Sequence, residues 1–416
     1  MSKTRTMTGL LGAGLMLGGA ALLSPAAHAQ SDSVNGQRSS QNAGLNGGGA
    51  GNGDFNDGGG NGGAFNNAVD AYNKKDYAKA AKELQGFIKD NPKDAQAHRL
   101  MADIFVRQDK IADAIPEWEA AVKFDGNDRV SRENLGAAYL QTQQFDKAVQ
   151  MYKAAYAKKP KDGETAYYYG LSLAQSGHTA EAIPVLQSAV ASKPTAPAYM
   201  QLGVTLDKSG KHAEAADAFA AAAKLDPKNP QPLLYSGLIY HQTGSDARAI
   251  PALQQALALG TDDPFDAHIA LAEAAATAKN TAGALKEFNL AAQAKPDNFN
   301  AWANIGILNQ NTGKTADAEA AYRKAIALTP PDPKALASVQ SNLALLLLPE
   351  GKADEAQTLL AQAIKNDPAN ARYSYNQGLA YEKQNKIADA IASYKQALTV
   401  DPNMTDAKQN MARISK

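Results

Sequence analysis

Histidines and carboxylates are the residues of this sequence best suited to chemistry, and their spacing argues against a reactive centre. Five histidines follow residue 29, at His98, His178, His212, His241 and His268. No two of them are four residues apart, the spacing that places two metal ligands on one helix face. Adjacent acids such as Asp262 and Asp263 lie at expected turns, where carboxylates cap helices. We expect neither a metal site nor an acid–base pair.

Other catalytic signatures are missing from the sequence as well. There is no cysteine, which excludes thiol catalysis, disulfides and cysteine-bound metal. The GxxxxGK[ST] loop that cradles phosphates and the GxSxG turn that presents a serine nucleophile are also absent. We therefore predict that the protein is not an enzyme and uses no cofactor.

The elements that position the polar side chains repeat along the chain. A bulky residue recurs every 33 to 38 residues, most often every 34, at Leu84, Trp118, Tyr152, Leu186, Phe219, Leu253, Phe288, Tyr322, Leu360 and Tyr394. Alanine stands four residues before each of them, and glycine or alanine stands sixteen before. Spacings of three and four share a helix face, and small residues let two helices approach closely. Each unit is therefore predicted to be a helix hairpin.

Prolines bound these hairpins. In eight of the ten units a proline follows the bulky residue by eight positions, from Pro92 to Pro402, and is expected to end the second helix. A 34-residue hairpin with small, bulky and proline positions in this order resembles the tetratricopeptide repeat, as at residues 201–229. The resemblance implies an all-α fold, a right-handed superhelical solenoid of about ten hairpins at residues 67–404. Residues 405–416 are predicted to form a capping helix for its open end.

The first 66 residues have a different character. Residues 1–29 combine Lys3 and Arg5 with an apolar run and an Ala27-His28-Ala29 pattern, which predicts a signal peptide cleaved near Ala29. Residues 30–66 are rich in glycine and asparagine and are predicted to be a disordered tether. We expect a periplasmic or secreted protein of a bacterial cell envelope, with no membrane span after cleavage.

The resemblance also implies which residues would contact a partner. In tetratricopeptide arrays the first helices line a concave groove, and the sixth residue of a unit often points into it. Amides and tyrosines at the fifth and sixth positions could hydrogen-bond and stack there. The candidate binding residues are Arg99, Asn134, Tyr167, Tyr168, Gln201, Tyr235, Asn304, Asn342, Tyr375 and Asn376. Alternatively, these side chains are only tolerated on a hydrated inner wall.

A basic stretch, MYKAAYAKKPKD at residues 151–162, could suggest nucleic-acid binding. The repeat pattern instead assigns Tyr152 to the core and Pro160 to the helix end, with the lysines on the outer face and in the turn. The chain has 42 Lys+Arg and 42 Asp+Glu, so no overall field attracts a nucleic acid. We expect no nucleic-acid partner.

Together these features predict a non-catalytic, exported scaffold that binds a partner protein or an extended peptide in its concave groove. The alternative is a polysaccharide-associated module of an exopolysaccharide or cell-envelope assembly machine, because a groove of Tyr, Asn and Gln also suits sugars. An enzyme is a third hypothesis, which no catalytic set of residues supports.

Overall fold

The computed structural model describes residues 62–415, and the regular structure there is α-helical. These residues form 21 helices, α3 to α23, and no strand. The predicted signal peptide and most of the predicted tether lie outside the described residues. The described chain divides within α13 into two compact units, which we call the N-terminal unit (residues 62–239) and the C-terminal unit (residues 240–415).

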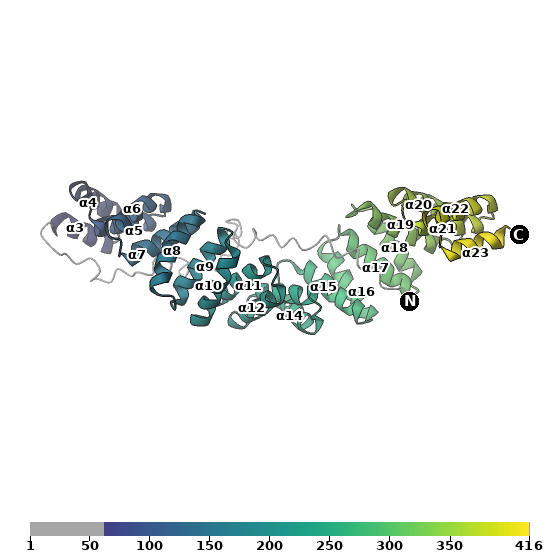
Figure 1. The fold of residues 1–416 in the computed structure, drawn as a ribbon, viewed down its shortest axis with the longest axis horizontal. Coiled ribbons are helices and arrows are strands. Elements are labelled where there is room, and N and C mark those ends of the chain that lie inside the picture. The colour runs from purple at the N-terminus through teal and green to yellow at the C-terminus, as the bar shows by residue number, and fades with distance from the viewer. Residues whose placement is uncertain (1–61, 416) are drawn as a thin grey trace. The chain divides into compact units, whose positions relative to one another are not determined.

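Within each unit, consecutive helices pack as hairpins, in which an odd-numbered first helix precedes an even-numbered second helix (Figure 1). The N-terminal unit contains α3 (Gly62–Asn73), α4 (Tyr77–Asp90), α5 (Ala95–Arg107), α6 (Ile111–Phe124), α7 (Arg129–Gln141), α8 (Phe145–Lys158), α9 (Gly163–Gln175), α10 (Thr179–Ser192), α11 (Ala196–Lys208), α12 (His212–Leu225) and most of α13 (Pro230–Gln242). The C-terminal unit contains α14 (Asp246–Leu259), α15 (Pro264–Thr277), α16 (Thr281–Ala294), α17 (Phe299–Asn311), α18 (Thr315–Ile326), α19 (Pro333–Leu347), α20 (Ala353–Asn366), α21 (Ala371–Lys383), α22 (Ile387–Val400) and α23 (Thr405–Ile414). The prediction of ten hairpins and one further helix is confirmed. None of these helices is long and apolar enough to span a membrane.

The turn inside each hairpin depends on one residue with positive φ, nine positions before the bulky residue. These residues are Lys75, Asp109, Gln143, Gly177, Gly210, Gly244, Lys279, Gly313, Gly351 and Asn385. A left-handed residue ends the first helix and reverses the chain within a few residues. Only five of the ten are glycine, so five turns hold a residue with a Cβ atom in a conformation that costs about 1 kcal/mol.

The two helices of a hairpin approach each other where the small residue of the first meets the bulky residue of the second. A Cβ atom added to Gly136 would lie 2.8 Å from the Tyr152 ring, and one added to Gly203 would lie 2.8 Å from the Phe219 ring. The bulky residues Trp118, Tyr322 and Tyr394 are fully buried. The small and bulky positions recognised in the sequence are therefore opposite halves of one contact.

The helical array begins before the predicted boundary at residue 67. Helix α3 starts at Gly62, and Phe65, which the prediction placed in the tether, is buried with its ring centroid 5.4 Å from that of Phe87. The glycine-rich composition of this segment obscured the helix. Burial of one aromatic side chain, worth about 1.5–3 kcal/mol, offsets the entropy lost by ordering neighbouring glycines.

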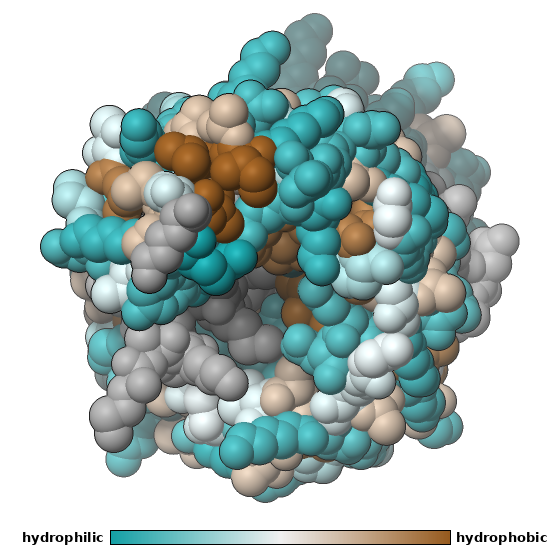
Figure 2. Space-filling model, turned by 90° about the vertical axis from the view of Figure 1, so that its right-hand side faces the viewer, coloured by the Kyte–Doolittle hydropathy of each residue, from teal (hydrophilic) through white to brown (hydrophobic). Residues whose placement is uncertain are grey.

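Helix α23 covers the end of the C-terminal unit. Its Ala407 is fully buried, and Met411 and Ile414 pack half-buried on the cluster formed with α21 and α22. Figure 2 looks onto this end of the chain, where hydrophilic residues cover most of the face and hydrophobic ones gather mainly in its upper half. The helix thus buries one apolar side and leaves a mostly polar end, as a terminal cap should.

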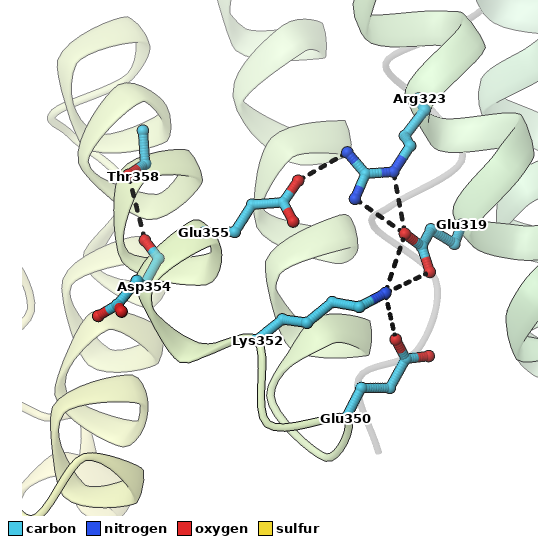
Figure 3. A network of polar contacts seen from close by, with 7 residues as sticks. All are labelled: Glu319, Arg323, Glu350, Lys352, Asp354, Glu355 and Thr358. Carbon is cyan, nitrogen blue, oxygen red and sulfur yellow. Dashed lines mark hydrogen bonds and ion pairs between the residues drawn. The ribbon is translucent and has the colours of Figure 1, made fainter.

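An ion-pair network joins α18 to the α19–α20 hairpin, where the repeat spacing widens to 38 residues (Figure 3). Glu319 accepts hydrogen bonds from Arg323 at 2.8 and 2.9 Å and from Lys352 at 3.3 Å. Arg323 also donates to Glu355 at 2.6 Å. Helix α18 has 12 residues, whereas α16 and α20 have 14, so the inserted residues are accommodated by an early helix end. Solvent screens these partly exposed pairs, so each adds little to stability.

Replacing Gly136 by alanine should destabilise the N-terminal unit. The new methyl group would meet a ring that cannot easily move, because the Tyr152 hydroxyl donates to the Glu133 carbonyl at 3.2 Å. Overpacking of this kind costs about 1–3 kcal/mol, against a helix-propensity gain of about 1 kcal/mol. We expect urea denaturation to show a net loss of about 1 kcal/mol.

Gly86→Ala is the matched control for this variant. Gly86 lies inside α4, and a Cβ atom there would meet nothing within 4 Å. It should raise stability by about 0.5–1 kcal/mol through helix propensity alone. Equal effects of the two substitutions would disprove the proposed role of the glycine–tyrosine contact.

Candidate binding surface on the first helices

All ten predicted binding residues lie on first helices. In the N-terminal unit they are Arg99 on α5, Asn134 on α7, Tyr167 and Tyr168 on α9, Gln201 on α11 and Tyr235 on α13. In the C-terminal unit they are Asn304 on α17, Asn342 on α19, and Tyr375 and Asn376 on α21. Their accessibility and their hydrogen-bond partners differ, and these decide what each could contact.

Three tyrosines form an aromatic surface in the N-terminal unit, which we call the tyrosine cluster: Tyr152, Tyr167 and Tyr168. Tyr168 stacks on Tyr152 with ring centroids 5.6 Å apart and an interplanar angle of 15°. Tyr167 meets Tyr168 edge to face at 5.1 Å. Tyr167 and Tyr168 are half-buried, and burial raises the pKa of Tyr167 to about 12. Tyr152 is buried and its hydroxyl donates to the Glu133 carbonyl, so the cluster offers neutral ring surface only through the half-buried Tyr167 and Tyr168.

Gln201 and Tyr235 continue this polar and aromatic character on α11 and α13. The Gln201 Nε2 donates to the Thr205 hydroxyl at 3.2 Å, while its Oε1 has no hydrogen-bond partner among residues 62–415. Tyr235 is half-buried, with its ring centroid 5.4 Å from that of Phe219. An amide acceptor held by one bond and an aromatic face suit contact with a peptide backbone and its side chains.

Arg99 and Asn134 are less available than a groove position requires. The Arg99 Nη1 lies 3.7 Å from Oδ1 of Asp128, the residue that caps the start of α7. Asn134 is only 4% exposed. Arg99 thus links its hairpin to the following one, and Asn134 is buried, so neither offers a free polar group to a partner.

Of the four predicted residues in the C-terminal unit, Asn304 is the one whose side-chain amide is left unbonded within residues 62–415. It is half-buried, and its side chain has no partner among the described residues. Asn376 is 7% exposed and donates to the Ser341 hydroxyl at 3.0 Å, and Tyr375 accepts from Asn410 of α23 at 3.2 Å. Burial raises the pKa of Tyr322, and a hydrogen bond with Asn342 partly offsets this. Three of the four side chains are thus already engaged within the fold.

Two titratable residues on this surface were not among the predicted ones. Burial raises the pKa of Asp103 on α5 to about 7, while Arg99 and Arg107 act in the opposite direction. His241, at the end of α13, lies between two carboxylates. Asp103 is the ninth residue and His241 the twelfth residue of its own hairpin repeat. They thus follow the fifth position of that repeat by four and seven residues. Helical periodicity from the fifth position could have identified both.

Comparison with known families agrees with this architecture. A family model described as "Tetratricopeptide repeat" matches residues 65–129, 134–197, 200–266, 247–299 and 341–405, and a second model with the same description matches residues 299–332. The chain belongs to the tetratricopeptide repeat family. Its membership rests on matches that cover most of the ten hairpins rather than on a single motif.

Two curated relatives illustrate how far the similarity extends. The chain is 27% identical over 213 residues to the human protein O-mannosyl-transferase TMTC1, covering 51% of this chain and 20% of that protein. It is 22% identical over 339 residues to the DnaJ homolog subfamily C member 7 homolog of Schizosaccharomyces pombe, covering 77% of this chain and 66% of that protein. The tetratricopeptide chain thus spans about a fifth of TMTC1.

Solved structures of similar proteins include YrrB, titled "a TPR protein with an unusual peptide-binding site". It has 22% identity and a TM-score of 0.39, and the match covers 48% of this chain and 99% of that one. The structure titled "Naa15/Naa10 bound to HypK-THB" has 16% identity and a TM-score of 0.43, covering 85% and 65% of the two chains. These likenesses concern the helical repeat itself.

Protonation of His241 should stabilise the C-terminal unit. Its Nε2 lies 3.1 Å from Glu273 Oε2 and its Nδ1 lies 2.7 Å from Asp246 Oδ1, and these contacts raise the pKa of His241 although burial opposes them. Because the folded chain holds this proton more tightly, the stabilisation is complete below the unfolded pKa of about 6.5 and is lost as the pH rises through the folded value.

We expect His241→Gln to lower the melting temperature most at about pH 5.5 and progressively less towards pH 8.5. His178→Gln serves as the control, because His178 is exposed and forms no ion pair within the described residues. Melting curves measured across this range should show a flat difference for the control. A flat difference for His241→Gln as well would contradict the charged-pair interpretation.

Proposed function

We propose that the protein is an exported, non-catalytic scaffold of the cell envelope that binds a partner protein or an extended peptide along its first helices. The observation that carries this proposal is the half-buried pair Tyr167 and Tyr168 on α9, together with the half-buried Gln201 on α11, whose Oε1 has no hydrogen-bond partner among residues 62–415. Tyrosine offers contact area and a hydroxyl at low entropic cost, which favours such surfaces in recognition.

The proposal includes no catalytic activity. The tetratricopeptide repeat is typically a non-catalytic scaffold. The similarity to O-mannosyl-transferases covers a fifth of TMTC1 and less of TMTC3, so it supports a shared repeat and not a shared reaction.

Peptide selection tests the binding surface directly. We expect panning of a displayed peptide library against the mature chain to yield binders, and Tyr167→Ala with Gln201→Ala to weaken them about tenfold. The loss of two contacts of about 0.7 kcal/mol each accounts for this effect. Gln187→Ala is the matched control, because Gln187 is exposed on the second helix α10. Selected peptides that bind the double variant unchanged would rule out this surface.

A polysaccharide ligand is the second candidate function. The half-buried ring of Tyr168, held flat by stacking on the buried Tyr152, favours it, because an aromatic face also suits a sugar ring. Binding on a glycan array that Tyr167→Ala abolishes, together with failure of the peptide selection, would favour this alternative.

Export is tested by the N-terminus of the protein in its own host. We expect mass spectrometry of the periplasmic or secreted fraction to find a chain that begins at Gln30, because Ala27 and Ala29 provide the small residues that signal peptidase requires. Ala27→Lys should leave the precursor uncleaved. Recovery of an intact Met1 in the wild-type protein would refute the export proposal.

A further inference from the structure

A small cavity lies between the third and fourth hairpins, within the N-terminal unit. It has a volume of about 190 Å³. Arg129, Arg132 and Glu133 line it from α7, Lys158 and Lys159 from the end of α8, and Thr165 from the start of α9. Four cationic side chains therefore surround one carboxylate.

The cations of this cavity are mostly unpaired. Arg129 lies 3.2 Å from Glu133 and 3.7 Å from Asp162, and the neighbouring Glu164 is paired with Lys193 at 2.9 Å. Arg132 donates to the carbonyl of Gly126, and Lys158 approaches the amide oxygen of Asn127 at 3.5 Å. Among the described residues, no carboxylate forms an ion pair with Arg132, Lys158 or Lys159.

The helix dipole accounts for the position of the two lysines but not for that of the two arginines. Lys158 and Lys159 lie at the C-terminal end of α8, where the helix dipole favours positive charge. Arg129 and Arg132 lie in the first residues of α7, where the same dipole disfavours it. A bound anion would relieve both the repulsion among the cations and the unfavourable position of the arginines.

The size of the cavity limits the ligand. Small-molecule sites usually have about 300–1,000 Å³, whereas this one holds the equivalent of about six waters at ~30 Å³ each. Thr165 is buried, and its hydroxyl has no hydrogen-bond partner within residues 62–415. The space suits one compact anionic group, held by guanidinium and ammonium groups with a hydroxyl donor opposite.

We propose that this cavity binds a single phosphate or sulfate group, free or as an ester. A dianion matches the local surplus of positive charge better than a carboxylate does. The cavity adjoins the tyrosine cluster, because the Tyr152 hydroxyl donates to the carbonyl of Glu133 at 3.2 Å. Its cationic side chains belong to neither the tyrosine cluster nor Gln201, so the proposal does not depend on the peptide surface.

Calorimetric titration of the mature chain with inorganic phosphate at low ionic strength tests the proposal. We expect saturable binding that weakens as NaCl is raised, and at least tenfold weaker binding of acetate. Arg132→Gln and Lys158→Gln should each weaken phosphate binding about tenfold, whereas Glu133→Gln should strengthen it because it removes the acidic group. Lys153→Gln is the matched control, since Lys153 is exposed on α8 and does not line the cavity.

Comparison of inorganic phosphate with glycerol 3-phosphate distinguishes a free ion from an esterified group, and binding of either supports the site. Circular dichroism should confirm that each variant keeps its helical content. No binding at millimolar phosphate, binding of acetate as tight as that of phosphate, or equal affinities for Lys158→Gln and Lys153→Gln would overturn the proposal.

Discussion

The contact between a small residue on the first helix and a bulky residue on the second is the constraint on which each hairpin depends. At Gly136 and Gly203 a single added carbon would lie 2.8 Å from the facing ring, closer than van der Waals contact allows. Interiors are packed as densely as organic crystals, so such a contact sets the distance between two helices. The sequence places a small and a bulky residue at the same positions of every hairpin, so each hairpin is closed by a contact of this kind.

This contact also determines which residues face outward. Successive residues of a helix are rotated by about 100°, so the sixth residue lies on roughly the opposite side from the eighth, which packs against the second helix. The sixth residue then meets the bulky residue of the preceding hairpin, as Tyr168 meets Tyr152 and Tyr235 meets Phe219. The sixth-position residues of the candidate surface therefore pack on the core residue of the preceding hairpin.

The repeat pattern in the sequence was sufficient to predict the hairpins, because each position of the period has one structural role. It could not predict the accessibility of each polar residue, since that depends on contacts between hairpins. Asn376 and Gln201 occupy the same position of the period, yet one donates to Ser341 and the other bonds within its own helix. The five turn residues other than glycine were hidden for a similar reason: packing of the hairpin imposes a left-handed conformation that lysine or glutamine would not adopt alone.

Binding sites in a repeat array are expected where neighbouring units differ from the average pattern. Each hairpin contacts mainly its neighbours, so a site at their junction needs suitable residues from only two units. The junction of α7, α8 and α9 combines such departures, with arginines at a helix start and lysines at a helix end around one cavity. The lysines of residues 151–162 had seemed to be ordinary outer-face charges of a neutral chain. Two of them, Lys158 and Lys159, line the same cavity as Arg129 and Arg132 of α7. The order of charges along the sequence does not show that these four residues lie together.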